Sequence, residues 1–357
     1  MSAHRLLTAL ATSLLLAACS SGVATTSPEP GSGGSDSGTV TLVTYDSYAI
    51  SKDTLKAFTE QTGQKVEVVR GGDAAEVVNR AILTKNAPEG DVLFGVDNNL
   101  LSRAVGEGLF VPYRARGVEA VPADYRLDPQ DNVTPIDVGD VCVNYDREFF
   151  ADKNLAIPQS LADLTQPEYR DLLVVQNPGT STPGLAFLLA TVSEFGPDGF
   201  TGFWQQLRDN GAQVENSWDT AYYERFSGGS GKGSRPLVVS YASSPPAEVV
   251  FAQEPPRKAP TGVLLDTCYR QIEFAGLLAE APNPGGGQQL IDFMLTRAYQ
   301  EDLPLNNFVF PVLPDAQLPA VFTDNAQVPA RPLSLPPEEV AANRDAWVSA
   351  WTDVVQR

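Results

Sequence analysis

The spacing of hydrophobic positions changes repeatedly along the first part of the chain. Short runs of the strand type, such as the alternating KVEVV at 65–69, are separated by stretches whose apolar residues recur at helical spacing. The expected order is a strand at 39–45, a helix from Ser51 to Gly63, a strand at 65–69, a helix at 74–84, a strand at 91–96 and a helix at 100–107. This order is typical of βαβ units, which predict a mostly parallel sheet with ligands at the carboxyl ends of its strands.

Two long extended runs, 132–146 and 261–278, lie in separate halves of the chain. Roughly 320 residues follow residue 37, more than one hydrophobic core usually serves, so we expect an α/β protein with two lobes. The two runs would be hinge strands between the lobes. Lobe 1 is expected at 39–138 plus about 272–314, and lobe 2 at about 139–271.

The segment 315–357 is not assigned to either lobe. It contains a predicted terminal helix that opens at Pro336-Pro337 and places Val340, Trp347, Trp351 and Val354 at helical spacing. We expect the two tryptophans to belong to the core rather than to a ligand site.

The N-terminus predicts export. An apolar run from Leu6 to Leu16 is too short to span a membrane and precedes Ala17-Ala18-Cys19, so residues 1–18 resemble a lipoprotein signal peptide with Cys19 as the lipidated residue. The alternative is an unmodified secreted protein. Because residues 19–38 are mostly Ser, Gly, Thr and Pro, they predict a flexible tether, which places the protein outside the cytoplasmic membrane on a lipid anchor.

The histidine content and the net charge exclude several classes of function. The single histidine, His4, lies in the expected signal peptide, so the processed protein would lack histidine-dependent triads, histidine-ligated zinc and histidine acid–base catalysis. A formal charge of -19 makes nucleic acid an unfavourable partner and favours a cationic ligand modestly, although acidity for solubility outside the cell is the better explanation of the charge. We expect no metal and no cofactor.

Cys142 and Cys268 both lie in the long extended runs. In an exported protein, paired thiols oxidise readily, so the two residues are either a disulfide or two separate buried thiols.

Two polar segments at predicted strand ends are candidates for binding. Asp97 and Asn98 follow a buried strand, where an Asn-rich turn and helix cap is the structural alternative. In NPGTSTPG, Thr182 and Pro183 are typical of a helix N-cap and first position, and Ser181 lies just before them. Free amides and hydroxyls at 179–181 would also suit an anion or a phosphate.

Aromatic residues also gather at strand ends. Tyr45 ends the first strand, Trp218 and Tyr222 cluster near Asp219, and Tyr241 follows the strand PLVVS. Each alone is more typical of a core, but together they favour an aromatic cage for a flat heteroaromatic cation.

Several blocks together resemble the thiamine-binding subunits of bacterial ABC importers. They are VTYDSYA, DVLFGVDNNLL, NPGTSTPGLAFLL, SWDTAYY, SYASSPPAE and PLNNFVFPV, in that order over nearly all of the chain after the tether. The resemblance implies a type II periplasmic binding protein fold: two α/β lobes, two hinge strands and a ligand cleft between the lobes.

The resemblance also implies a role for individual residues. Tyr45 and Tyr241 would offer ring faces to the pyrimidine and thiazolium rings, and Asp73 would lie near the polar edge of the pyrimidine or its cationic neighbour. Ser181 and Thr182 would hold the hydroxyethyl or phosphate end, beside Trp218 and Tyr222. Phe308 replaces a tryptophan that is usual in the family, which leaves the choice among thiamine, its monophosphate and its diphosphate open.

Three functions remain as hypotheses. The first is a monomeric thiamine receptor that delivers its ligand to an ABC permease and its ATPase. The second is ferric-iron capture by the adjacent Tyr222 and Tyr223. The third is a secreted carboxylate-dependent enzyme, which we do not expect because no isolated carboxylate pair is visible.

Overall fold

The computed structural model describes residues 38–254, 256 and 258–356. The expected signal peptide, Cys19 and nearly all of the tether lie outside these residues, so lipidation and anchoring stay predictions. Within the described part of the chain, no helix combines the length and the apolar character that a membrane span needs.

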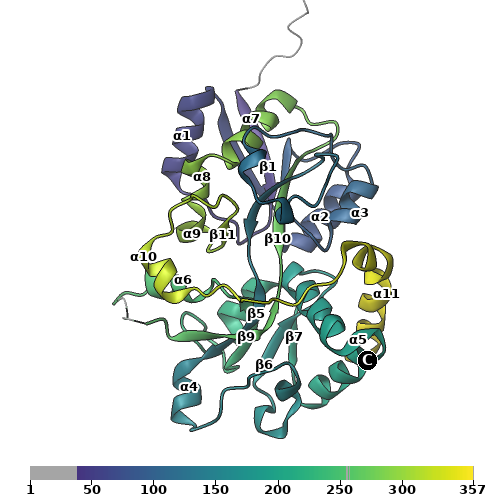
Figure 1. Ribbon diagram of the computed structural model, residues 1–357, viewed down its shortest axis with the longest axis vertical. Helices are drawn as coiled ribbons and strands as arrows, with labels where there is room; N and C mark the ends of the chain where they lie inside the picture. The colour runs from purple at the N-terminus through teal and green to yellow at the C-terminus, as the bar shows by residue number, and fades with distance from the viewer. Residues whose placement is uncertain (1–37, 255, 257, 357) are drawn as a thin grey trace, which may run out of the picture. The chain divides into compact units, whose positions relative to one another are not determined.

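The described strands form two sheets, and the first has six strands in the order β11-β4-β10-β3-β1-β2 (Figure 1). Its strands are β1 (Thr39–Thr44), β2 (Lys65–Arg70), β3 (Val92–Asp97), β4 (Thr134–Val138), β10 (Ile272–Leu277) and β11 (Phe310–Pro311). The accompanying helices are α1 (Lys52–Thr62), α2 (Ala74–Leu83), α3 (Leu101–Gly106), α7 (Pro284–Met294), α8 (Arg297–Gln300) and α9 (Leu303–Asn306), with short 3-10 turns at Val118–Ala120 and Ala123–Tyr125.

The second sheet has five described strands in the order β7-β6-β8-β5-β9. These are β5 (Val141–Asp146), β6 (Leu173–Gln176), β7 (Gln213–Glu215), β8 (Leu237–Tyr241) and β9 (Thr261–Tyr269). Its helices are α4 (Arg147–Asp152), α5 (Thr182–Asp209), the π-helical turn η5 (Thr220–Arg225), α6 (Pro245–Val250), α10 (Ala320–Asn325) and α11 (Pro337–Val355), with 3-10 turns at Ala162–Thr165 and Pro167–Tyr169.

Strand direction is only partly parallel. The βαβ units give parallel pairs, β1 with β2 and β3 in the first sheet and β6 with β7 and β8 in the second. The strands from the two long extended runs instead pair antiparallel with their neighbours. The expectation of mostly parallel sheets is therefore wrong for these strands. The chain passes directly from a strand of one sheet to a strand of the other, so no crossover helix sets a parallel direction.

Each long run crosses from one sheet to the other. The first passes from β4 to β5 through Gly139 and Asp140, and the second from β9 to β10 through Arg270 and Gln271. Arg270 Nε donates to Asp140 Oδ1 at 2.5 Å, so an ion pair joins the two crossings. This is the arrangement that hinge strands require, while hinge motion and the numerical lobe limits stay predictions.

Cys142 and Cys268 form a disulfide in the structure. Cys142 lies on β5 and Cys268 on β9, which are neighbours in the second sheet. The bond therefore joins two strands of one sheet, next to the crossings, and does not tie the two sheets together.

Helix ends follow the capping residues in the sequence. Ser51 caps α1 by accepting from the Thr54 amide, and Gly63 ends the helix with a φ of 76°. At α5 the expected cap is displaced by one position: Ser181 has the extended cap conformation, so Thr182 is already the first helical residue. α5 bends at Gly196, whose φ of 75° interrupts the helix before Pro197.

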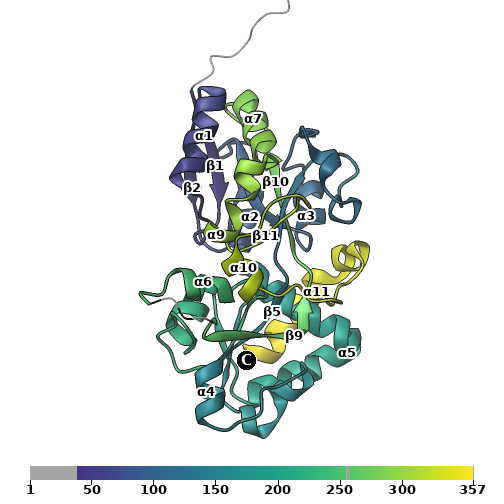
Figure 2. The same ribbon diagram turned by 60° about the vertical axis from the view of Figure 1, so that its left-hand side comes forward.

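The C-terminal segment returns to the second sheet. α10 packs beside α6, and α11 packs along α5, as Figures 1 and 2 both show. Trp347 and Trp351 are buried, and the Trp351 ring meets Trp204 of α5 edge-on at 5.6 Å. Both tryptophans are core residues, as the helical spacing indicated.

Candidate ligand-binding site

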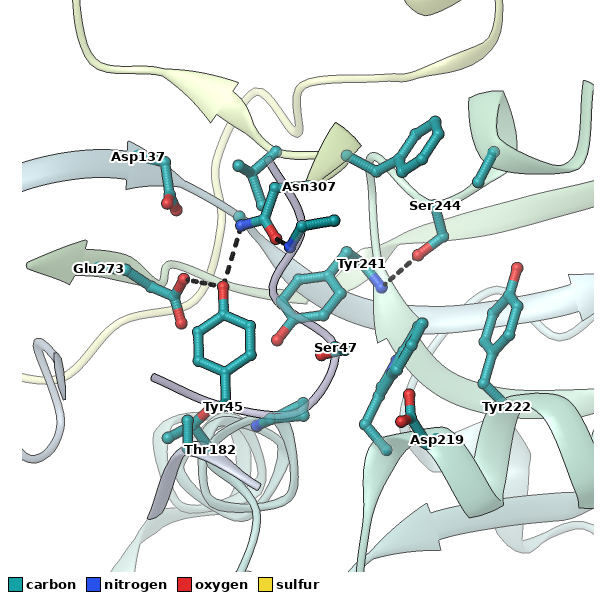
Figure 3. Close-up of a pocket in the computed structure, with 18 of the residues that line it drawn as sticks. Tyr45, Ser47, Asp137, Thr182, Asp219, Tyr222, Tyr241, Ser244, Glu273 and Asn307 are labelled. Atoms are coloured by element: carbon teal, nitrogen blue, oxygen red, sulfur yellow. Dashed lines mark hydrogen bonds between the residues drawn. The ribbon is translucent and has the colours of Figure 1, made fainter. Parts of the chain in front are cut away.

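A cavity of about 320 Å³ is lined by residues from both sheets (Figure 3). Most of its lining follows strands: Tyr45 after β1, Asp73 after β2, Thr182 after β6, Trp218 after β7 and Tyr241 at the end of β8. The carboxyl ends of parallel strands are where open α/β sheets bind ligands. The volume lies in the range of pockets for small molecules.

One wall of the cavity is aromatic. Trp218 stacks on Tyr222 with ring centroids 4.9 Å apart and an interplanar angle of 20°, and Tyr241 lies at 6.4 Å with a tilt of 52°. Trp218 Nε1 donates to Ser240 Oγ, which fixes the indole. Tyr222 is 2% exposed and donates its hydroxyl to Glu248, so it supports the indole from behind. Trp218 and Tyr241 are the partly exposed rings of this wall.

Tyr45 lies on the opposite side and is more buried than its position at a strand end indicated. Its ring is 9% exposed and packs against Phe94 at 5.9 Å and edge-on against Tyr48 at 6.2 Å. Its hydroxyl donates to Glu273 Oε2 and accepts from Asn307 Nδ2, each at 2.9 Å. Tyr45 therefore lines the cavity and is also part of the core.

Asp73 connects the two sheets at the cavity. As the N-cap of α2 it accepts from its neighbour Ala74, and its second oxygen accepts from the Trp218 amide at 2.9 Å. Burial of the carboxylate raises the pKa of Asp73 to about 6, and the hydrogen bonds from Trp218 and Ala74 oppose the shift.

Other carboxyl groups make the cavity acidic. Asp137, Asp219 and Glu273 also line it, and none of the described lining residues is Lys, Arg or His. Burial raises the pKa of Glu273 to about 8. Burial, followed by repulsion from Glu273, raises the pKa of Asp137 well above its usual range. A buried acidic site without a basic partner favours a cationic occupant.

Phe308 closes part of the rim. It lines the cavity, contacts Phe251 with ring centroids 5.4 Å apart, and has a φ of 52°, an uncommon value for a residue other than glycine. Strained backbone of this kind is often found at ligand sites, and here it directs an aromatic ring to the rim.

Three predicted site residues, Asp97, Asn98 and Ser181, do not line the cavity. Asp97 is fully buried and accepts from the amides of Asn99 and Leu100, so it caps the turn before α3. Asn98 exchanges hydrogen bonds with the backbone of Ile272 across the sheet. The structural alternative, a polar turn with a cap, therefore describes Asp97, whereas Asn98 pairs with the neighbouring strand; a contact of either residue with the ligand stays a prediction.

The backbone amides of the predicted anion site already donate hydrogen bonds within the protein. The amides of Gly179, Thr180 and Ser181 all donate to Asn177, and Ser181 is fully buried behind the cavity wall. Thr182 alone of the predicted pair lines the cavity. These amides are therefore not free for a phosphate.

Other lining residues were not identified from the sequence. The polar ones among them are Ser47, Asp137, Ser244, Gln271, Glu273, Asn306 and Asn307. Asp137 and Glu273 are acidic residues inside otherwise apolar strands, and a buried charge in a strand is the signal that could have marked them.

The adjacent tyrosines are not arranged as free ligands for iron. Tyr222 donates its hydroxyl to Glu248 at 2.7 Å, and Tyr223 is 42% exposed with its ring at 80° to that of Tyr222. Burial, followed by the charge of Glu248, raises the pKa of Tyr222, which disfavours the phenolate that binds ferric iron.

Comparison with known proteins gives a consistent result. Residues 88–330 match the family described as bacterial extracellular solute-binding protein. The chain is 32% identical over 326 residues to the thiamine-binding periplasmic protein of Escherichia coli (strain K12), covering 89% of this chain and 94% of that protein. A solved structure of a periplasmic thiamin binding protein is similar with a TM-score of 0.78 and 31% identity, covering 89% of this chain and 96% of that one. Iron uptake protein A1 of Synechocystis sp. is 23% identical over 282 residues, covering 77% and 76%.

Proposed function

This chain belongs to the bacterial extracellular solute-binding protein family, and on that premise we propose that it is an extracytoplasmic receptor that binds thiamine and delivers it to an ABC importer. The expected two-lobed periplasmic binding protein fold is confirmed by the solved relative. The family is one of solute-binding receptors, so the expectation of a binding protein rather than an enzyme is also confirmed.

The observation that carries the proposal is the composition of the cavity wall. Thiamine consists of a flat aminopyrimidine ring joined to a flat, positively charged thiazolium ring, and the cavity offers it aromatic rings and carboxyl groups with no basic side chain among the described lining residues. Each desolvated cation–π contact contributes about 0.5–2 kcal/mol. The relatives that are 30% or more identical over most of the chain carry the name thiamine-binding, which supports the same ligand.

Within this proposal, Trp218 and Tyr241 supply the ring faces for the cation, and Tyr45 closes the opposite side. Asp73 supplies a negative charge beside them. Thr182 and Phe308 bound the remaining ends of the ligand. Tyr222 acts through Trp218, since it supports the indole without being exposed itself.

Delivery and anchoring are parts of the proposal that rest on the sequence. A monomeric receptor held at the membrane by a lipid on Cys19 would present the closed, ligand-bound form to a permease that a cytoplasmic ATPase powers. Metabolic labelling with a tagged fatty acid tests the anchor: the full-length chain should be labelled, and Cys19→Ala should be unlabelled and released from the membrane.

Calorimetric titration of the processed protein with a set of ligands tests the binding function. Thiamine should bind, whereas its uncharged thiazole fragment should bind far more weakly because it lacks both the positive charge and the pyrimidine ring. Ferric citrate serves as the test of the iron alternative, with absorbance recorded for the colour of an iron–tyrosinate complex. Ferric binding without thiamine binding would overturn the proposal.

A further inference from the structure

Asp137 and Glu273 form a pair of carboxyl groups on one side of the cavity. They are directly opposed partners in the antiparallel pairing of β4 with β10, so their side chains leave the same face of the sheet (Figure 3). Asp137 is fully buried and Glu273 is 6% exposed. Both residues line the cavity.

The polar atoms on this side lack partners. Neither carboxyl oxygen of Asp137 accepts a hydrogen bond, and both side-chain polar atoms of Gln271 are unpaired although that residue is also fully buried. Glu273 has one partner, the hydroxyl of Tyr45. Unpaired polar groups in a buried position carry a cost that an incoming donor would remove.

The surroundings of the pair are acidic. Besides burial, the charges of Asp97 and Asp73 raise the pKa of Glu273. Besides burial, the charge of Asp137, of Glu273 or of both raises the pKa of four nearby tyrosines, Tyr45, Tyr48, Tyr241 and Tyr299. The arginines near these groups are engaged elsewhere: Arg70 with the Tyr48 carbonyl, Arg270 with Asp140 and Arg344 with Asp345.

Two adjacent buried carboxyl groups without a cation cannot both be ionised at neutral pH. Burial raises the pKa of Glu273 to about 8, and burial together with the charge of Glu273 raises the pKa of Asp137. The two groups titrate as a unit, which holds at least one proton in the ligand-free protein at neutral pH.

We propose that Asp137, Glu273 and Gln271 form the subsite that binds the positively charged or N–H-bearing part of the ligand, and that ligand binding expels a proton from the carboxyl pair. This rests on the proposed function, since thiamine supplies both the cation and an amino group. The proton passes to solvent and the ligand's charge replaces it, so the charge of the site is balanced. Affinity should therefore rise with pH toward about pH 8 and then level off, because the pair that has lost this one proton is the form that the cation prefers.

Two measurements test this inference. The first is carbon-13 NMR of the carboxyl groups in ligand-free wild type, where a carboxyl group should titrate near pH 8 and this titration should be absent in Glu273→Gln. Carboxyl groups that all titrate below pH 6 would overturn the proposal, whether or not any variant folds.

The second is calorimetry of thiamine binding at pH 7.5 in two buffers with different ionisation enthalpies. Wild type should release up to about one proton per thiamine bound. Glu273→Gln should release clearly less, and Glu67→Gln, which removes an exposed carboxylate outside the cavity, should release as much as wild type. Binding without proton release overturns the inference and leaves the proposed function standing, whereas no thiamine binding overturns both.

Discussion

Replacing Asp73 by asparagine separates its role in binding from its role in folding. The side chain accepts two backbone hydrogen bonds, from Ala74 at 2.7 Å within α2 and from Trp218 at 2.9 Å across the cavity. Asparagine is as good an N-cap as aspartate, so the first contact survives. The change removes the negative charge beside the aromatic wall.

Asp73→Asn should change stability and thiamine affinity in opposite directions. Because the folded pKa of Asp73 is raised to about 6 from 3.8, the folded state binds more protons than the unfolded state in this range, and stability falls as pH rises from about 4 to 6. A shift of about two pKa units means that ionised Asp73 lowers the free energy of unfolding at pH 7 by about 3 kcal/mol. Asparagine carries no charge, so the variant does not have this cost. Thiamine binding, in contrast, should weaken by about 1.5–3 kcal/mol, the range for a hydrogen-bonded charged group.

Calorimetric titration of thiamine into wild type and Asp73→Asn at pH 7, with thermal melts of both proteins, measures the two effects together. The variant should bind roughly tenfold or more weakly and melt at the same or a higher temperature. Unchanged affinity with a sharply lower melting temperature would show that the carboxylate is structural, and the reasoning would be refuted.

The other predictions concern the aromatic wall, the rim and the disulfide. Tyr241→Ala should weaken thiamine binding by about 1–3 kcal/mol in calorimetry with little change in melting temperature. Tyr45→Ala should weaken binding and also lower the melting temperature, because that ring packs on two aromatic neighbours. Equal falls in the melting temperatures of the two variants would contradict this distinction. Phe308→Trp should tighten binding a few-fold because indole is the better cation–π partner, and an unchanged or weaker affinity would show that this side chain does not meet the cation. Removing the bond between Cys142 and Cys268, which are 126 residues apart, should cost about 4–5 kcal/mol in urea unfolding, and a loss below about 1 kcal/mol would contradict a stabilising role.

The order and type of elements in the first sheet could be predicted from local signals. Ser51 and Gly63 delimit α1, and the alternating pattern at 65–69 gives β2, because capping and periodicity act within a few residues. Strand direction at the crossings could not be predicted in this way. It depends on which sheet the chain enters next, which is a long-range property of the fold.

The candidate site could be predicted where residues stand at strand ends. Tyr45, Asp73, Trp218 and Tyr241 all reach the cavity for this reason. Asp97 also ends a strand, yet its side chain turns back to the amides of the next turn, and sequence position alone does not distinguish these two outcomes.

Asp137 and Glu273 could not be predicted as site residues because they lie inside long extended segments whose sequence is typical of structural strands. Their acidic side chains come together only through the pairing of β4 with β10, between segments more than 130 residues apart in the chain. The cost of burying these carboxyl groups without hydrogen-bond donors is visible in the folded structure and not in either run alone.

Native mass spectrometry of the processed protein, in the presence of excess thiamine and ferric citrate together, tests the central claim most directly. The account predicts one adduct, with the mass of the thiamine cation, that is strongly reduced in Trp218→Ala. An iron adduct in its place, or the mass of the empty chain despite excess thiamine, would contradict it.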